Sequence, residues 1–393
     1  MAEQPPSLNL HQAVGGTEAW RRLSTAFYTC VDRDPRLRHL FPGKTLRCAI
    51  EELTAFLVQI FGGPSADSQR RWWLSLRESH RRFKISQQER VAWMENMRNA
   101  LNDAGIAEPL RAALLEFFEG ASAHVVNTGE AVKGSPDPEG EPPDAVRREM
   151  ARRWQSQLEL EKAVAALRAG HVERAITLAE SSLLRTRLQA DQTVLVGLLG
   201  MMMSTRNAAA LSYVQQKVNQ NPALVREHYA GRTLLHEGSA QGNLAMVELF
   251  LSLGSDPDEK TAGGHTPLYC LANQYGGSDG GAVVHSLVQR GANVNASDGV
   301  KHCTPLHMAA RRGSVAIAKA LLDCGAHIEA RDSLGETPLR RAVNCGKLQV
   351  ADLLLERAAD VHASSKKGLT PLQAARTAAM KQLLQSRVQA SKH

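Results

Sequence analysis

The chain has 393 residues, of which 47 are basic and 40 acidic, and its net charge is +7 at pH 7. This length predicts two folded units, and a small basic excess without a basic, aromatic-rich stripe argues against a nucleic-acid partner. Six scattered cysteines with no CxxC pair give no sign of a disulfide framework. There is no signal peptide and no apolar run of the roughly 20 residues that a bilayer requires, so we expect a cytoplasmic protein without a membrane partner.

Helical periodicity dominates the first third of the chain. Its apolar residues recur at i, i+3, i+4 and i+7, which is typical of helices with one buried face. Glycine, proline and a Ser-x-x-Glu capping box mark the helix ends. The predicted helices are, in order, a stretch closing at 26–28 and broken at Asp34-Pro35, then 46–60 before Gly62-Gly63-Pro64, one opening at Ser86–Glu89, and 110–127.

His80 stands alone between two of these helices, with Phe83 three residues beyond it. A neutral imidazole in such a position can hold an iron atom. The chain has 14 histidines, and any one of them is by default an ordinary surface or core residue. His80 becomes a candidate ligand because ordered motifs flank it on both sides.

A linker is predicted over residues 129–145, because Gly134–Pro143 is rich in proline and acidic residues. Residues 146–227 are predicted to be helical and imperfectly repetitive. Within them Ala163–His171 resembles the helix-Gly-helix core of a degenerate ankyrin unit. A second such unit is expected through Leu198, Leu199, Asn207 and Val214, with a tetratricopeptide-like helix pair as the alternative. Terminal repeats are often atypical because they cap a stack.

A Thr-Pro-Leu signature, or a near copy, recurs in the second half at intervals of 33, 38, 33 and 33 residues. This period and signature resemble ankyrin repeats, which we expect over residues 228–388. Each unit exposes an apolar face that only its neighbours can cover, so the repeats must stack. His236 and His307 are predicted to bridge helices or repeats and not to bind metal, since no second ligand lies at i+3 or i+4. The signatures begin at Thr233, Thr266, Thr304, Thr337 and Thr370.

The motifs within residues 10–128 resemble those of the group 2 truncated haemoglobins, which are bacterial-like globins. The resemblance implies an all-α chain: a two-over-two truncated globin followed by an ankyrin-repeat α-solenoid with degenerate N-terminal repeats. The matching motifs are Val14-Gly15-Gly16, Ala26-Phe27-Tyr28, Leu37-Arg38 with Phe41-Pro42, Glu51 to Gly63-Pro64, Arg77 with His80, Phe83 with Ile85-Ser86, and Arg90 with Ala92-Trp93.

The same resemblance implies haem (iron protoporphyrin) as the cofactor, with His80 as the proximal iron ligand. Tyr28 and Trp93 match the distal hydroxyl and indole. Oxygen bound to ferrous iron acquires superoxide character, and a hydrogen bond from either donor to it is worth about 1.5–3 kcal/mol. The competing interpretation has Phe27 pointing inward in place of Tyr28. The other implied haem contacts are Phe41, Ala49, Leu53 and Phe83. For Phe41, Ala49 and Leu53, ordinary packing is the alternative.

The contacts to the haem propionates depart from the family pattern. The family usually has a tyrosine shortly after Gly-Gly-Pro and an arginine just before the ligand, whereas this chain has Asp67 and Ser79. The substitutes are Arg71, Arg77 and Lys84, although charged residues there equally suit a solvated face.

Three functions follow from this layout. In the first, the globin binds oxygen or another diatomic gas, acts as a gas or redox sensor, and is joined to an ankyrin domain that binds an unknown protein partner. In the second, it is a redox enzyme of the nitric oxide dioxygenase or peroxidase type that its ankyrin repeats localise. In the third, the chain is a haem-free protein-interaction scaffold. Two donors beside a bound gas favour slow release, which suits sensing or redox chemistry better than bulk transport.

Overall fold

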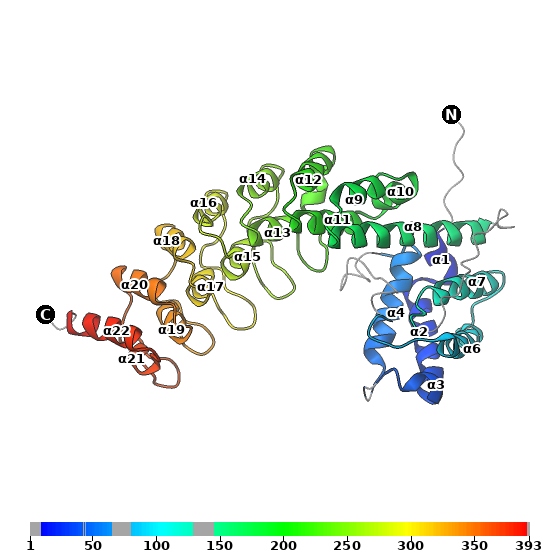
Figure 1. The fold of residues 1–393 in the computed structure, drawn as a ribbon, viewed down its shortest axis with the longest axis horizontal. Coiled ribbons are helices and arrows are strands. Elements are labelled where there is room, and N and C mark those ends of the chain that lie inside the picture. Colours follow the sequence, from blue (N-terminus) through cyan, green and yellow to red (C-terminus); the bar gives the residue numbers. More distant parts are fainter. Residues whose placement is uncertain (1–8, 42, 44, 65–79, 129–144, 391–393) are drawn as a thin grey trace. The chain divides into compact units, whose positions relative to one another are not determined.

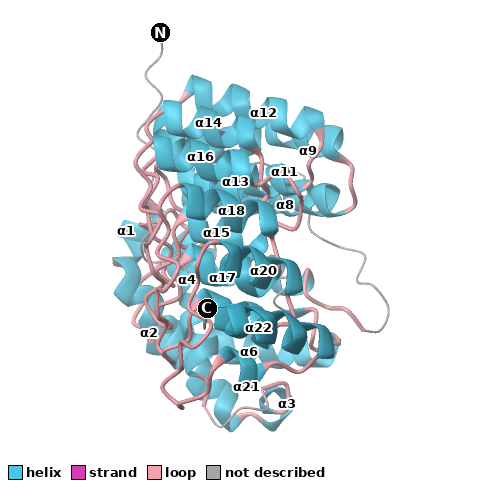
Figure 2. Ribbon diagram, turned by 90° about the vertical axis from the view of Figure 1, so that its left-hand side faces the viewer, coloured by secondary structure: helices cyan, strands magenta, loops and turns pink. Residues whose placement is uncertain are grey.

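The computed structural model describes residues 9–390, except 42, 44, 65–79 and 129–144. The described residues form helices and no β-strand, apart from one isolated β-bridge between Tyr229 and Arg232. This confirms the all-α fold class (Figures 1 and 2). The chain divides into two compact units, Met1–Gly197 and Leu198–His393. Arg71, Arg77 and nearly all of the predicted linker lie outside the described residues.

The first unit is built on helices that cross over one another. Helix α2 packs against both α4 and α6, and α6 packs against α7. The predicted capping box is present, because Ser86 caps the start of α6 and Glu89 accepts from the Ser86 backbone N–H at 2.8 Å. The helices are α1 (Leu10–Val14), α2 (Gly16–Arg33), α3 (Pro35–Arg38), α4 (Arg47–Ile60), α6 (Gln87–Asp103) and α7 (Leu110–Ala123).

Helix α8 (Ala145–Arg168) adds to this core, although it follows the predicted linker in sequence. Met150 is 3% exposed within the same apolar cluster as α2, α4, α6 and α7, and the Trp154 ring meets Phe117 edge-on at 5.6 Å. Arg153 donates to the Ile60 carbonyl at the end of α4 at 3.1 Å. The further helices α9 (Val172–Ala179) and α10 (Ser182–Ala190) pack on α8, so the segment predicted as 146–227 is shared between the two units.

The second unit repeats one helix pair. Inner helices contact one another in series, as do the outer ones, and the two rows are visible in Figure 1. All five predicted threonines are helix N-caps. Helix α11 (Gln192–Ser204) crosses the unit boundary and is followed by α12 (Ala208–Gln220) and η2 (Pro222–Val225). The helix pairs after them are α13–α14 (Leu234–Ala240, Leu244–Ser252), α15–α16 (Pro267–Gln274, Gly281–Gln289), α17–α18 (Pro305–Arg312, Val315–Asp323), α19–α20 (Pro338–Asn344, Leu348–Glu356) and α21–α22 (Pro371–Ala374, Ala378–Ala390).

None of the helices in the described ranges combines the length and the apolar character needed to cross a membrane.

The fourth position of the first four signatures links a repeat to the next. The Nδ1 atom of His236 accepts the Thr233 backbone N–H at 3.1 Å, so its Nε2 carries the proton and donates to the Glu259 carbonyl at 3.0 Å. Bridging of this kind is the role predicted for both histidines. The same position donates to the next repeat in four signatures, through His236, Tyr269, His307 and Arg340.

Because these bridging histidines are buried, we expect the stability of the second unit to fall in acid. Burial lowers the pKa of His236 to about 4 and also lowers that of His307, so both are neutral in the folded state. The stabilisation is therefore present above the ordinary histidine pKa of about 6.5 and lost as pH falls toward 4. Urea unfolding of the full chain, followed by far-UV circular dichroism, should show a loss of about 1–2 kcal/mol between pH 7 and pH 5 from His236 alone.

His236→Gln should reduce that pH dependence, because glutamine does not titrate. The matched control is His362→Gln, which alters an exposed histidine of the same unit and should leave the pH dependence unchanged. Equal pH dependence in wild type and His236→Gln would contradict the assignment.

Candidate functional site

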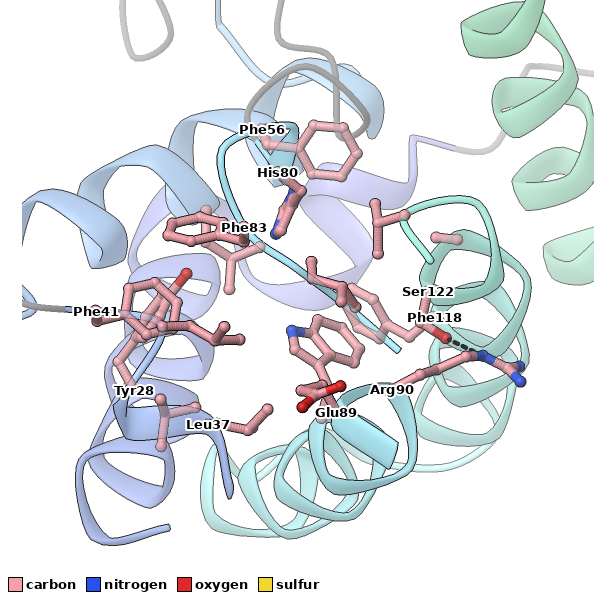
Figure 3. A pocket seen from close by; sticks show the side chains of 17 residues that line it. Tyr28, Leu37, Phe41, Phe56, His80, Phe83, Glu89, Arg90, Phe118 and Ser122 are labelled. Atoms are coloured by element: carbon pink, nitrogen blue, oxygen red, sulfur yellow. Dashed lines mark hydrogen bonds between the residues drawn. The ribbon is translucent and has the colours of Figure 1, made fainter. Parts of the chain in front are cut away.

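A cavity of about 720 Å³, counting the part open to solvent, lies inside the first unit. Helices α2, α4, α6 and α7 and the segment after His80 supply its walls, and the His80 ring points into it (Figure 3). Most of its lining is apolar or aromatic.

The cavity brings together six of the residues singled out in the sequence. Ala49 does not line it, and Lys84 is exposed and does not line it either. Arg71 and Arg77 fall outside the described residues, so the haem contacts assigned to all four stay predictions. The six lining residues are Tyr28, Phe41, Leu53, His80, Phe83 and Trp93.

Ring contacts connect the side chains of one wall. Tyr28 meets Phe41 edge-on at 5.6 Å, Phe41 lies 5.5 Å from Phe83, and Phe83 lies 6.1 Å from the His80 ring. Offset and edge-on pairs of this kind are worth about 0.5–1.5 kcal/mol each beyond the area they bury. The wall beside His80 is therefore a packed aromatic row, from which a flat apolar ligand gains dispersion contacts on entering.

Tyr28, and not Phe27, faces the cavity. Phe27 is 1% exposed and belongs to the packed core, whereas Tyr28 is half-buried and lines the cavity. Burial, with a smaller contribution from the Glu52 carboxylate, raises the pKa of Tyr28 well above its usual value. The phenol therefore keeps its proton at neutral pH and is available as a hydrogen-bond donor.

Trp93 supplies a second donor to the same space. Its ring packs against Phe27 at 5.0 Å and Phe118 at 5.7 Å, which holds the indole in place. Within the described part of the chain, neither the Tyr28 hydroxyl nor the Trp93 indole N–H has a hydrogen-bond partner. Half-buried donors that lack a partner favour a ligand that accepts hydrogen bonds.

Asn127 holds the segment that follows His80, a role the sequence did not reveal. Its side-chain amide donates to the Phe83 carbonyl at 2.8 Å and accepts the Ile85 N–H at 2.9 Å, and its own N–H bonds the Ile85 carbonyl at 2.9 Å. The sequence marked this residue only as the end of the last helix. No local pattern links it to a loop more than 40 residues earlier.

Polar groups at the edge of the cavity were also missed. Arg90 donates to the Ser122 hydroxyl at 3.2 Å and to the Glu119 carbonyl at 3.1 Å, which ties α6 to α7. Glu89 lines the cavity as well, and the Ser86 hydroxyl and backbone N–H lower its pKa. It is therefore ionised at neutral pH, and its capping role accounts for its position.

These features suit haem. An apolar cavity with one imidazole and two unpartnered donors matches what the cofactor requires: a dry site, one axial ligand and a polar partner for the gas. If haem were bound here, His80 would be the residue able to bind the iron, Phe41 and Phe83 could pack on the macrocycle, and Tyr28 and Trp93 could donate to a gas molecule.

Comparison with known proteins gives two families of similarity. A model of bacterial-like globins matches residues 9–127, and ankyrin-repeat models match residues 230–262 and 270–365. Two-on-two hemoglobin-3 of Arabidopsis thaliana is 31% identical over 130 residues, which are 32% of this chain and 74% of that protein. Group 2 truncated hemoglobin YjbI of Bacillus subtilis is 30% identical over 125 residues, 32% of this chain and 94% of that protein. Ankyrin repeat and SOCS box protein 11 of Danio rerio is 39% identical over 103 residues, 26% of this chain and 33% of that protein.

Asn127→Ala should destabilise the first unit by about 1–2 kcal/mol, because it removes two side-chain hydrogen bonds to the segment after His80. All five tryptophans lie in the first unit, so urea unfolding followed by tryptophan fluorescence reports on this unit alone. Asn102→Ala is the control, since Asn102 makes an exposed hydrogen bond away from the cavity and its loss should cost under about 0.5 kcal/mol. Equal midpoints for the two variants would show that Asn127 does not hold the segment.

Proposed function

Because the chain belongs to the group 2 truncated haemoglobins in its first third and carries ankyrin repeats in its second half, we propose that it binds haem and a diatomic gas and that its ankyrin stack binds a protein partner. The observation that carries the haem proposal is the cavity, where one imidazole and two unpartnered donors face a largely apolar space. We further propose that this gas binding serves sensing.

His80 is the proposed axial ligand. Among the described residues that line the cavity it is the one histidine, and the hydrogen bond from the Phe83 N–H to its carbonyl, at 3.0 Å, closes a turn that fixes its backbone. When bound, haem supplies an iron whose free face takes a small gas molecule. Most of the lining is apolar, and a hydrogen bond made in apolar surroundings is stronger than one made in water.

Tyr28 and Trp93 are the proposed gas-binding donors. Because burial keeps the Tyr28 phenol protonated and packing holds the Trp93 indole, neither group reorganises much to meet an acceptor. Preorganised donors lower the dissociation rate more than they alter association. Slow release supports a sensing or redox role over bulk transport.

His80→Ala should abolish the Soret band of the full chain expressed with a haem precursor, because the axial ligand is removed. His39→Ala is the control: this exposed histidine lies outside the cavity lining, and its loss should leave the band intact. An unchanged band in His80→Ala would reject the ligand, and a colourless wild-type protein supplied with haemin would reject haem binding altogether.

Tyr28→Phe and Trp93→Phe should each speed oxygen release about tenfold or more, since each removes a hydrogen bond worth about 1.5–3 kcal/mol. Flash photolysis of the ferrous protein measures the rate. Tyr275→Phe removes the hydroxyl of a tyrosine in the second unit, outside the cavity lining, and should leave the rate within about twofold of wild type. Fast release from the wild type would remove the case for sensing.

A further inference from the structure

A second, polar pocket lies wholly within the ankyrin unit, at the base of the loop that precedes α17. It encloses about 500 Å³, counting the part open to solvent. Three successive repeats contribute to it, because Tyr269 lies on α15, Arg311 on α17 and Arg341 on α19. We call it the hairpin pocket, and the residues used below are His265, Tyr269, Asp298, Lys301, Arg311 and Arg341.

Most of the charged groups of the hairpin pocket already have partners. Asp298 accepts the Lys301 N–H at 2.7 Å and the Tyr269 hydroxyl at 3.1 Å. Burial opposes its ionisation, but these donors outweigh burial, so the pKa of Asp298 is lowered. Arg341 pairs with Asp332 at 3.0 Å and with Glu336 at 3.3 Å. Asp298 and Arg341 are thus satisfied within the protein.

Arg311 and the Lys301 ammonium are the exceptions. Within the described residues, the Arg311 side chain makes one hydrogen bond, to the neutral amide of Asn273 at 2.9 Å. No acidic side chain in the described parts of the chain pairs with either cation. A guanidinium presents a fork of donors that matches a carboxylate, and a half-buried cation gains from such a pair more than an exposed one does. The pocket therefore presents two cations to which an anionic group can bind.

The surroundings favour a polypeptide over a free small acid. Val300, which lines the pocket, is 75% exposed, and Leu334 in the following loop is 52% exposed. The two loops are joined by a hydrogen bond from the Ser333 N–H to the Lys301 carbonyl at 2.8 Å, so both apolar tips lie beside the pocket. Two exposed apolar side chains beside a charged pocket offer a polypeptide apolar contacts that a small free acid cannot use.

We propose that the hairpin pocket binds an acidic side chain of a partner polypeptide, with aliphatic neighbours of that side chain resting on Val300 and Leu334. Arg311 and Lys301 hold the carboxylate, and the stacked rings of His265 and Tyr269, 4.4 Å apart, form a flat wall beside it. This proposal rests on the proposed protein-binding role of the ankyrin stack and adds the chemical class of the partner segment.

The experiment selects random 12-residue peptides on the full chain and measures the affinity of the enriched peptides by fluorescence anisotropy. Enrichment of Asp or Glu beside aliphatic residues is expected, and Glu→Gln versions of those peptides should bind about tenfold more weakly. Arg311→Gln should weaken binding by about the same factor, which corresponds to roughly 1.4 kcal/mol. The matched control is Arg312→Gln, which removes the same charge from the next residue of α17, an exposed position outside the lining, and should stay within about twofold of wild type.

Three results would overturn the proposal. The first is that the enriched peptides show no acidic preference, or that Arg311→Gln and Arg312→Gln weaken their binding equally. Either outcome would reject the hairpin pocket as an acidic subsite while keeping the protein-binding role of the ankyrin unit. Tight binding of inorganic phosphate that depends on Arg311 would reassign the pocket to a small anion. No enrichment at all would count against the protein-binding role itself. A urea midpoint equal to that of wild type shows that Arg311→Gln is folded, and Lys301→Gln at an exposed position provides a second variant.

Discussion

The packing of α7 between two sets of aromatic rings is the constraint on which the first unit depends. Phe117 and Phe118 are adjacent in sequence but serve different neighbours. Phe118 packs on Trp93 at 5.7 Å on the cavity side, while Phe117 packs on Trp154 of α8 at 5.6 Å. Burying each phenylalanine contributes about 1.5–3 kcal/mol, and each ring pair adds about 0.5–1.5 kcal/mol. Adjacent residues of α7 thus contact the cavity wall on one side and α8 on the other.

The same contacts give a route by which a change in the cavity on gas binding would reach α8. Phe118 lines the cavity, its ring lies 5.3 Å from Phe117, and Phe117 contacts α8. Helix α8 is also held by the hydrogen bond between His124 and Glu161 at 3.1 Å, and its second half packs under α9 and α10. A displacement of Phe118 therefore has a path of direct contacts to the helix on which the following helices rest. Sensing requires that the liganded and unliganded states differ along that path.

The sequence predicted the parts of the structure that short-range periodicity controls. The helices, the capping box at Ser86 and the threonine N-caps all depend on residues within a few positions of one another. It did not predict that α8 completes the globin core, because Met150 and Trp154 find their partners more than 30 residues away across a proline-rich segment. Asn127 was missed for the same reason: its role depends on backbone groups of a distant loop. Within the cavity, the resemblance located the aromatic and imidazole side chains but not the edge formed by Arg90 and Ser122.

The two units differ in how far a local pattern determines their contacts. In the ankyrin unit, the residue three positions after each of the first four threonines reaches a group 29 residues further along the chain, whether it is histidine, tyrosine or arginine. A periodic sequence therefore specifies periodic long-range contacts, and chemically different side chains meet the same geometric requirement by donating one hydrogen bond. The globin has no such period, and each of its tertiary contacts is specified once. A family resemblance was thus needed to identify its cavity, whereas counting residues was enough to identify the stack.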